Sequence, residues 1–224
     1  MRRVALTALI AGALWLVSTA GYFAVSPWLG ATVGYNDAPV FFAIYYTGFA
    51  GAAGFAYRDL FAGLAETDLR GLALPLASMA LVFLAYAGFI LPLLPETAWT
   101  RDTQPVEFFW ATQWYFLPKS LEILFQDVLI AALVLALTRT GMRLVWLSVL
   151  TALLFGGFHV TMGLSYPNPF YVARYTAAAA LFGAMVPWLI LRLKGGFLAV
   201  YGVHWGYYAL DIALIHWVFA APEG

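Results

Sequence analysis

The sequence contains no cysteine and few charged residues, and both shortages narrow the class of protein. Without cysteine, the chain can form no disulfide, no thiolate metal site and no cysteine nucleophile. Charged residues make up 10% of the 224 positions, against about 25% in a soluble domain. Hydrophobic residues make up 64%, and the mean hydropathy is +0.86. This composition predicts an integral membrane protein with almost no room for a soluble domain.

The formal net charge is zero, so the composition points to no nucleic-acid partner and no polybasic lipid-binding patch. Runs of about 20 apolar residues are long enough to cross a bilayer as helices. We therefore expect one all-α membrane domain over residues 1–224, a bundle of about seven spans. The predicted spans are 4–25, 39–57, 71–94, 119–138, 144–164, 175–193 and 196–221. The first has basic residues before it, but its apolar run exceeds that of a secretory signal, so we interpret it as a retained signal-anchor.

The basic residues predict the orientation of the spans, because cytoplasmic loops carry an excess of Lys and Arg. A cytoplasmic N-terminus and an external C-terminus place most of them inside. The inside set is Arg2, Arg3, Arg58, Arg70, Arg139, Arg143, Arg192 and Lys194, and the outside set is Arg101, Lys119 and Arg174. We expect a multi-pass protein of the cell membrane, in contact with membrane lipids.

The connection between the third and fourth predicted spans, residues 95–118, is long and rich in aromatic residues. Trp and Tyr favour the headgroup level, so one interpretation is a segment of the interfacial aromatic belt. The other is a re-entrant or gating element beside an intramembrane site. The aromatic residues concerned are Phe108, Phe109, Trp110, Trp114, Tyr115 and Phe116.

Six acidic and histidine residues fall inside the predicted spans, although each costs roughly 2.5–3.5 kcal/mol to insert there. Such residues usually face a protein-lined cavity, so the sequence predicts a polar site within the bilayer. The six are Glu122, Asp127, His159, His204, Asp211 and His216.

Helix geometry separates the two acids of the fourth span. At about 100° per residue, Glu122 and Gln126 lie about 40° apart on one helix face. Asp127 lies about 140° from Glu122, so the two acids are not expected to share one small pocket. Glu122 belongs either to the polar site or to the outer headgroup level beside Lys119. Asp127 either forms a helix-packing hydrogen bond or belongs to the site.

The histidines occur in distinctive local contexts. Two glycines precede His159, which weakens the helix and opens space beside the imidazole, although a packing role is the alternative. His204 and Tyr208 are one turn apart in the last span. Asp211 returns to within about 20° of His204, but roughly 10 Å along the axis. We therefore expect Asp211 to meet a group on a neighbouring helix.

These residues resemble the signature of the CPBP intramembrane endopeptidases, which include CAAX prenyl proteases and bacteriocin-processing or immunity proteins. That signature has Glu-Glu-x-x-x-Arg at a helix start, Phe-x-x-x-His ending the next helix, and His-x-x-x-Asn two helices later. Phe155 and His159 match the second motif, and His204 matches the third. Glu122 aligns with the second glutamate. The resemblance covers residues 119–221.

The resemblance implies a hydrolase that cleaves a peptide bond in a membrane-associated peptide or protein, with residues 1–118 supplying N-terminal spans and the aromatic segment. Glu122 would activate water, and the histidines would donate to the developing oxyanion. The implied catalytic residues are Glu122, His159 and His204, and the supporting residues are Gln126, Phe155, Tyr208, Asp127 and Asp211. Alternatively, the same three catalytic residues would hold one zinc ion; otherwise no cofactor is implied.

Three positions depart from the family pattern. Leu121 replaces the first glutamate, Gln126 the arginine and Tyr208 the asparagine. Gln126 leaves Glu122 without the arginine that would hold it charged, which suits a general base. The departures also favour a second reading, a non-catalytic CPBP-like protein acting as a partner, chaperone or immunity factor. A small transporter would equally place Glu, Asp and His within the membrane.

Overall fold

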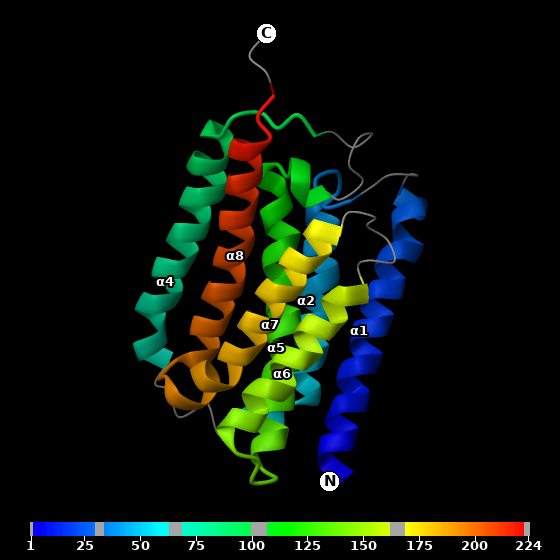
Figure 1. Ribbon diagram of the computed structural model, residues 1–224, viewed down its shortest axis with the longest axis vertical. Coiled ribbons are helices and arrows are strands. Elements are labelled where there is room, and N and C mark those ends of the chain that lie inside the picture. Colours follow the sequence, from blue (N-terminus) through cyan, green and yellow to red (C-terminus); the bar gives the residue numbers. More distant parts are fainter. Residues whose placement is uncertain (1, 30–33, 63–68, 100–106, 162–168, 222–224) are drawn as a thin grey trace. The chain divides into compact units, whose positions relative to one another are not determined.

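Nearly all of the described chain is helical. The computed structural model describes residues 2–29, 34–62, 69–99, 107–161 and 169–221 (Figure 1). These ranges contain no β-strand, only one isolated antiparallel bridge between Thr97 and Ala220. The predicted all-α class is confirmed.

Seven long helices coincide with the seven predicted spans. Six of them are long and apolar enough to cross a membrane, α4 when it is counted with the π-helical and 3₁₀ turns that extend it to Leu93, whereas α6 is apolar but has 17 residues. The span count of seven and the orientation of the helices therefore stay predictions. The seven helices are α1 (Arg2–Leu29), α2 (Pro39–Ala56), α4 (Leu69–Ala85), α5 (Phe116–Thr138), α6 (Leu144–Val160), α7 (Pro169–Arg192) and α8 (Gly196–Val218).

Short helical segments join the long helices. A π-helical turn and a 3₁₀ turn extend α4, and two 3₁₀ turns precede α5. Two connections use a glycine in the left-handed region: Gly141 (φ 80°) after α5 and Gly195 (φ 71°) after α7. The short segments are α3 (Arg58–Phe61), η2 (Tyr86–Ile90), η3 (Leu91–Leu93), η4 (Glu107–Trp110) and η5 (Gln113–Tyr115).

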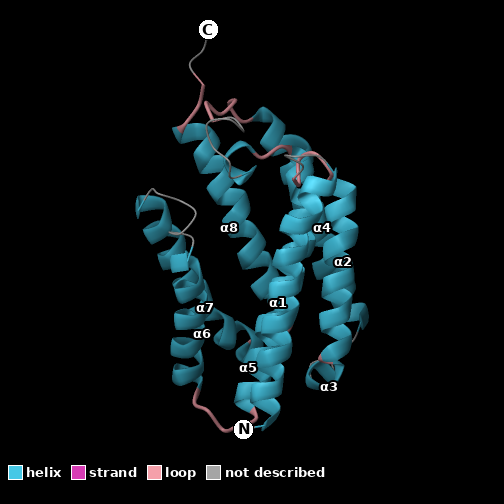
Figure 2. Cartoon of the chain, turned by 90° about the vertical axis from the view of Figure 1, so that its right-hand side faces the viewer, coloured by secondary structure: helices cyan, strands magenta, loops and turns pink. Residues whose placement is uncertain are grey.

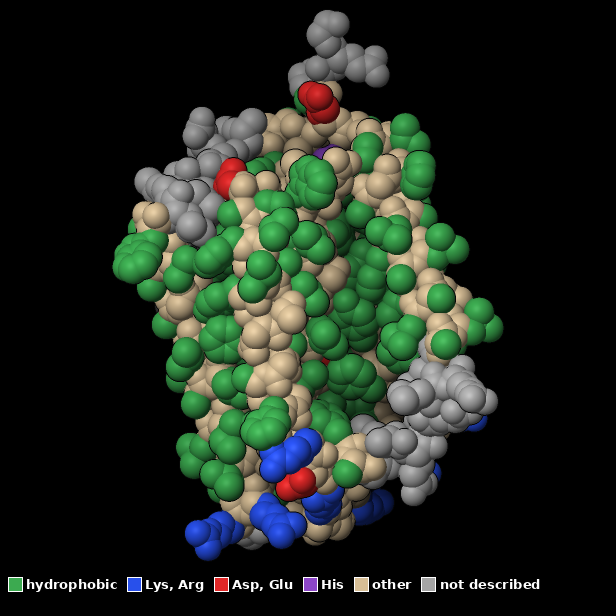
Figure 3. Space-filling view, turned by 180° about the vertical axis from the view of Figure 1, so that it is seen from behind, with side chains coloured by type: hydrophobic (Ala, Val, Ile, Leu, Met, Phe, Trp, Pro, Cys, Tyr) green, Lys and Arg blue, Asp and Glu red, His purple; other side chains and the backbone are tan. Residues whose placement is uncertain are grey.

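The long helices expose large apolar side chains, as lipid-facing helices do. Leu9 is 71% exposed, Leu74 75% and Leu153 67%. Hydrophobic side chains cover most of the face drawn in Figure 3, and Lys and Arg gather near one end. A soluble monomer rarely exposes so continuous an apolar surface. The surface is compatible with an integral membrane protein.

The chain divides into two compact units, and α1, α5 and α8 each contribute to both. The first unit comprises residues 1–11, 57–67 and 129–200. The second comprises the remaining residues. Their positions relative to one another are not determined.

In the first unit, α6 and α7 lie side by side (Figures 1 and 2). The buried Thr151 hydroxyl donates to the Gly183 carbonyl at 2.6 Å. A Cβ on Gly183 would lie 2.5 Å from the Thr151 carbonyl oxygen, so glycine is required for this close approach. The core of this unit is formed by Ile130, Ala131, Val134, Val186, Leu189, Ile190 and Val200.

In the second unit, the end of α8 is fixed to the segment that follows α4. The backbone N–H of Ala98 donates to the Phe219 carbonyl at 2.7 Å, and the Trp99 and Phe219 rings stack with centroids 4.0 Å apart. The buried His216 lies with Nδ1 2.8 Å from the Pro95 carbonyl oxygen. His216 is thus used in local packing.

The aromatic connection enters α5 directly, so that helix begins at Phe116, three residues before the predicted start. Phe116 is buried against Tyr86 and Trp205, with ring centroids 5.1 Å from each. This packing stabilises an additional helical turn. The re-entrant interpretation of residues 95–118 stays a prediction, and residues 100–106 of that connection lie outside the described residues.

Candidate functional site

Glu122 lies near the start of α5 and accepts three hydrogen bonds. Its Oε2 accepts from the Tyr35 hydroxyl at 3.0 Å and from Lys119 Nζ at 2.8 Å. Its Oε1 accepts from Gln126 Nε2 at 2.8 Å. Lys119 and Gln126 stand three residues before and four after Glu122, the spacings that bring helical side chains together. We call these four residues the Glu122 cluster.

Glu122 has a basic partner, although Gln126 stands where the family has its arginine. Lys119 takes the place of that arginine, because it stands three residues before Glu122 and so lies on the same face of α5. Both side chains are largely buried, 8% exposed for Lys119 and 17% for Glu122. Three donors, one of them cationic, therefore satisfy the two carboxylate oxygens of Glu122.

A second buried pair joins α5 to α8. Asp127 Oδ1 lies 2.9 Å from His204 Nδ1. Asp127 is fully buried, and its Oδ2 has no hydrogen-bond partner within the part of the chain that the structure describes. The two acids of α5 therefore have different partners, as the helix geometry predicted.

Tyr208 contacts both groups of polar residues. The Lys119 ammonium lies 4.0 Å from the centre of the Tyr208 ring, a cation–π distance. The His204 ring centroid is 5.7 Å from that of Tyr208. Through Tyr208, the Glu122 cluster and the Asp127–His204 pair form one continuous polar region of the second unit. Tyr208 is one of the residues that depart from the family pattern.

Ser120 fixes the register of α5 against α8 beside this region. Its hydroxyl accepts from Trp205 Nε1 at 2.9 Å, and its carbonyl accepts from the Tyr201 hydroxyl at 3.1 Å. The Ser120 hydroxyl in turn donates to the Phe116 carbonyl one turn earlier. These bonds hold the two helices at the height where Asp127 meets His204.

Glu107 supports the Glu122 cluster by binding the backbone of Tyr35, which is a member of the cluster. Sequence reasoning missed both residues. The Glu107 carboxylate accepts backbone N–H groups of Tyr35 (2.7 Å) and Asn36 (3.1 Å). A Cβ on Gly34 would overlap this carboxylate, so Gly34 is the local signal for the approach. Thr112 completes the contact by donating its N–H and hydroxyl to the Asn36 side chain.

Burial determines the protonation of these loop groups. It raises the pKa of the Glu107 carboxyl, although the N–H groups of Tyr35 and Asn36 act in the opposite direction. Burial and the charge of Glu122 hold the pKa of Tyr35 well above its usual value. The Tyr35 hydroxyl therefore stays protonated and donates a hydrogen bond to Glu122.

His159 belongs to the first unit, so neither unit alone brings the three predicted catalytic residues together. Its Nδ1 lies 2.8 Å from the Phe155 carbonyl oxygen, one turn earlier in α6. Since a carbonyl can only accept, Nδ1 carries the proton in this bond. The Phe155 side chain packs against the core of the first unit. The Phe-x-x-x-His spacing thus orients the imidazole locally.

Among the described residues, no three His, Asp or Glu side chains gather in a group that could hold a metal ion. The three residues of the zinc alternative belong to two units whose relative positions are not determined, so that alternative stays a prediction. Asp211 is buried on α8, at 4% exposure. Comparison of the chain with known protein families, curated proteins and solved structures finds no match, so the resemblance to CPBP endopeptidases rests on the motif residues alone.

Proposed function

We propose that the chain is a membrane-embedded hydrolase that cleaves a peptide bond, with His204 as the general base. The observation that supports this most is the 2.9 Å contact between Asp127 Oδ1 and His204 Nδ1. A buried carboxylate at one ring nitrogen fixes the imidazole tautomer and stabilises the imidazolium that forms on proton uptake. Proton exchange with water then occurs through the other ring nitrogen, Nε2.

In this proposal, His204 takes a proton from water while the hydroxide attacks the scissile carbonyl carbon. The imidazolium then returns the proton to the leaving amine as the carbon–nitrogen bond breaks. Lys119 supplies positive charge for the developing oxyanion, and its burial strengthens that interaction. Glu122 holds Lys119 in place. It is therefore not the general base, which is the role that the family resemblance implies for it.

A non-catalytic CPBP-like membrane protein is the second candidate, and the Glu122 cluster favours it. A carboxylate with an ammonium and two further donors has the composition of a structural ion pair. Under this candidate, the Asp127–His204 pair fixes how α5 packs on α8, and the protein acts by binding another membrane protein.

Asp127→Asn separates the two candidates, because it keeps the shape of the side chain but no longer fixes the imidazole tautomer. Purified protein in detergent would be incubated with a library of quenched fluorescent peptides that contain apolar segments. For a hydrolase, turnover should fall by about 10³–10⁴-fold in Asp127→Asn. The exposed Asp59→Asn is the matched control and should retain wild-type turnover.

The same measurements identify a non-catalytic protein. Wild type and His204→Ala would then give equal, background cleavage of every peptide. Thermal unfolding of each variant shows whether a loss of cleavage reflects chemistry or misfolding. Turnover that Asp127→Asn leaves intact in a folded protein would refute His204 as an Asp-oriented base.

A further inference from the structure

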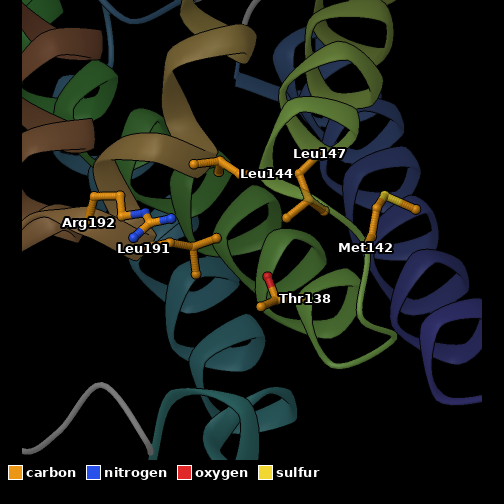
Figure 4. A pocket seen from close by; sticks show the side chains of 6 residues that line it. All are labelled: Thr138, Met142, Leu144, Leu147, Leu191 and Arg192. Atoms are coloured by element: carbon orange, nitrogen blue, oxygen red, sulfur yellow. The ribbon is translucent and has the colours of Figure 1, made fainter.

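A pocket of about 330 Å³ lies in the first unit, where α5 ends, α6 begins and α7 ends. Its volume is within the range of small-molecule sites, about 300–1,000 Å³. These helix ends are the boundaries of predicted spans, so the pocket lies at the level of a membrane interface. The residues that line it are Thr138, Met142, Leu144, Leu147, Leu191 and Arg192 (Figure 4).

The lining is mostly apolar, with a cation at one side. Figure 4 shows Arg192 and Met142 on opposite sides, with the leucines and Thr138 between them. The Thr138 hydroxyl donates to the Val134 carbonyl at 2.8 Å, so its proton is already used within α5. Arg192 is therefore the side chain of this lining that offers charged donors to a ligand.

The N-terminus of α6 adds a second source of positive potential. Leu144 is the first residue of this 17-residue helix and lines the pocket. The preceding residue, Arg143, makes no side-chain capping hydrogen bond. Within this first turn, the Trp146 N–H donates to the Arg143 carbonyl at 2.9 Å. The other N–H groups at a helix start, together with the helix dipole, favour an anion beside them.

The charges of the first unit agree with an anionic ligand. Asp59 is the one acidic residue among the described residues of this unit. Arg139 and Arg143 are exposed and close in sequence to residues of the pocket lining. Basic pockets between transmembrane helices are suited to phospholipid headgroups. The net charge of the whole chain, which is zero, conceals this local excess.

We infer that this pocket binds one anionic phospholipid. The lipid phosphate lies between Arg192 and the N-terminus of α6, and an acyl chain lies against Leu144, Leu147 and Leu191. A zwitterionic lipid makes the same apolar contacts, but it brings a cationic group to a basic surface and should therefore bind less tightly. The site is independent of the proposed hydrolase chemistry, since all its residues belong to the first unit.

Native mass spectrometry of the full-length, delipidated protein in mild detergent tests this inference. Phosphatidylglycerol should bind with a stoichiometry of one and more tightly than phosphatidylcholine of the same acyl chains. Arg192→Gln should weaken phosphatidylglycerol binding by about fivefold, as expected for one basic residue near a lipid surface. Lys194→Gln removes the same charge two residues away, outside the pocket lining, and should leave binding within about twofold of wild type.

Three results would overturn the inference. The first is equal binding of phosphatidylglycerol and phosphatidylcholine by the wild-type protein. The second is an equal loss of binding in Arg192→Gln and Lys194→Gln, which would indicate a diffuse surface attraction. The third is displacement of phosphatidylglycerol by millimolar inorganic phosphate, which would make a free phosphate the occupant. Arg192→Lys should restore part of the affinity, because the charge returns without the guanidinium geometry.

Discussion

Asp127 and His204 are 77 residues apart in sequence, yet Asp127 Oδ1 lies 2.9 Å from His204 Nδ1. Both are buried, since Asp127 has no exposed surface and His204 is 8% exposed. A buried acid of this kind is costly unless a partner satisfies it, so each residue depends on the other. This pair joins α5 to α8, and both candidate functions depend on it.

We expect this dependence to appear as non-additive losses of stability. Asp127→Leu and His204→Phe should each lower the free energy of unfolding by about 3–5 kcal/mol, because each leaves one buried polar group unpaired. The double variant should lose less than the sum of the two. Titration with a denaturing detergent measures all four proteins. Losses that add within error would show that the two side chains act independently.

Tyr35→Phe tests whether the Tyr35 hydroxyl stabilises the Glu122 cluster. It removes a donor to a carboxylate and should cost about 1.5–3 kcal/mol of unfolding free energy. Tyr45→Phe is the matched control, since it removes a hydroxyl that donates to the neutral Ser18 carbonyl at 2.7 Å. That change should cost about 0.5–1.5 kcal/mol. An equal or larger effect at Tyr45 would argue against a charge-assisted bond at Tyr35.

Glu107 should give the protein a specific dependence of stability on pH. Burial raises the pKa of its carboxyl, so the folded protein binds this proton more tightly than the unfolded chain. The contribution is therefore largest below the ordinary Glu pKa of about 4.3 and declines as pH rises through the raised folded pKa. The stability of wild type relative to Glu107→Gln should therefore fall as pH rises above about 4.3. A relative stability that rises with pH would contradict the raised pKa.

The topology of α6 decides the number of spans. Its 17 residues give about 26 Å of helix, against a hydrocarbon core of about 30 Å. If α6 crosses, reporter fusions at Gly141 and Gly224 should report opposite sides, with Gly141 in the cytoplasm. If the other six helices cross and α6 does not, both fusions report the same side. The latter result would replace seven spans by six.

Local periodicity explains what the sequence determined. Apolar runs located all seven long helices, and the 3.6-residue repeat put Gln126 beside Glu122 and turned Asp127 away from it. These relationships depend on residues within two helical turns of one another. They therefore hold whichever helices pack around α5.

Only the tertiary structure decided which distant groups meet these residues. The partners of Asp127 and Glu122 on other elements, His204 and Tyr35, depend on the rotation and axial position of packed elements, which no local pattern encodes. The start of α5 depended likewise on the burial of Phe116 against Tyr86, a residue of another element. Helix geometry is set by backbone hydrogen bonds within a segment, whereas a polar site is set by side-chain packing between segments.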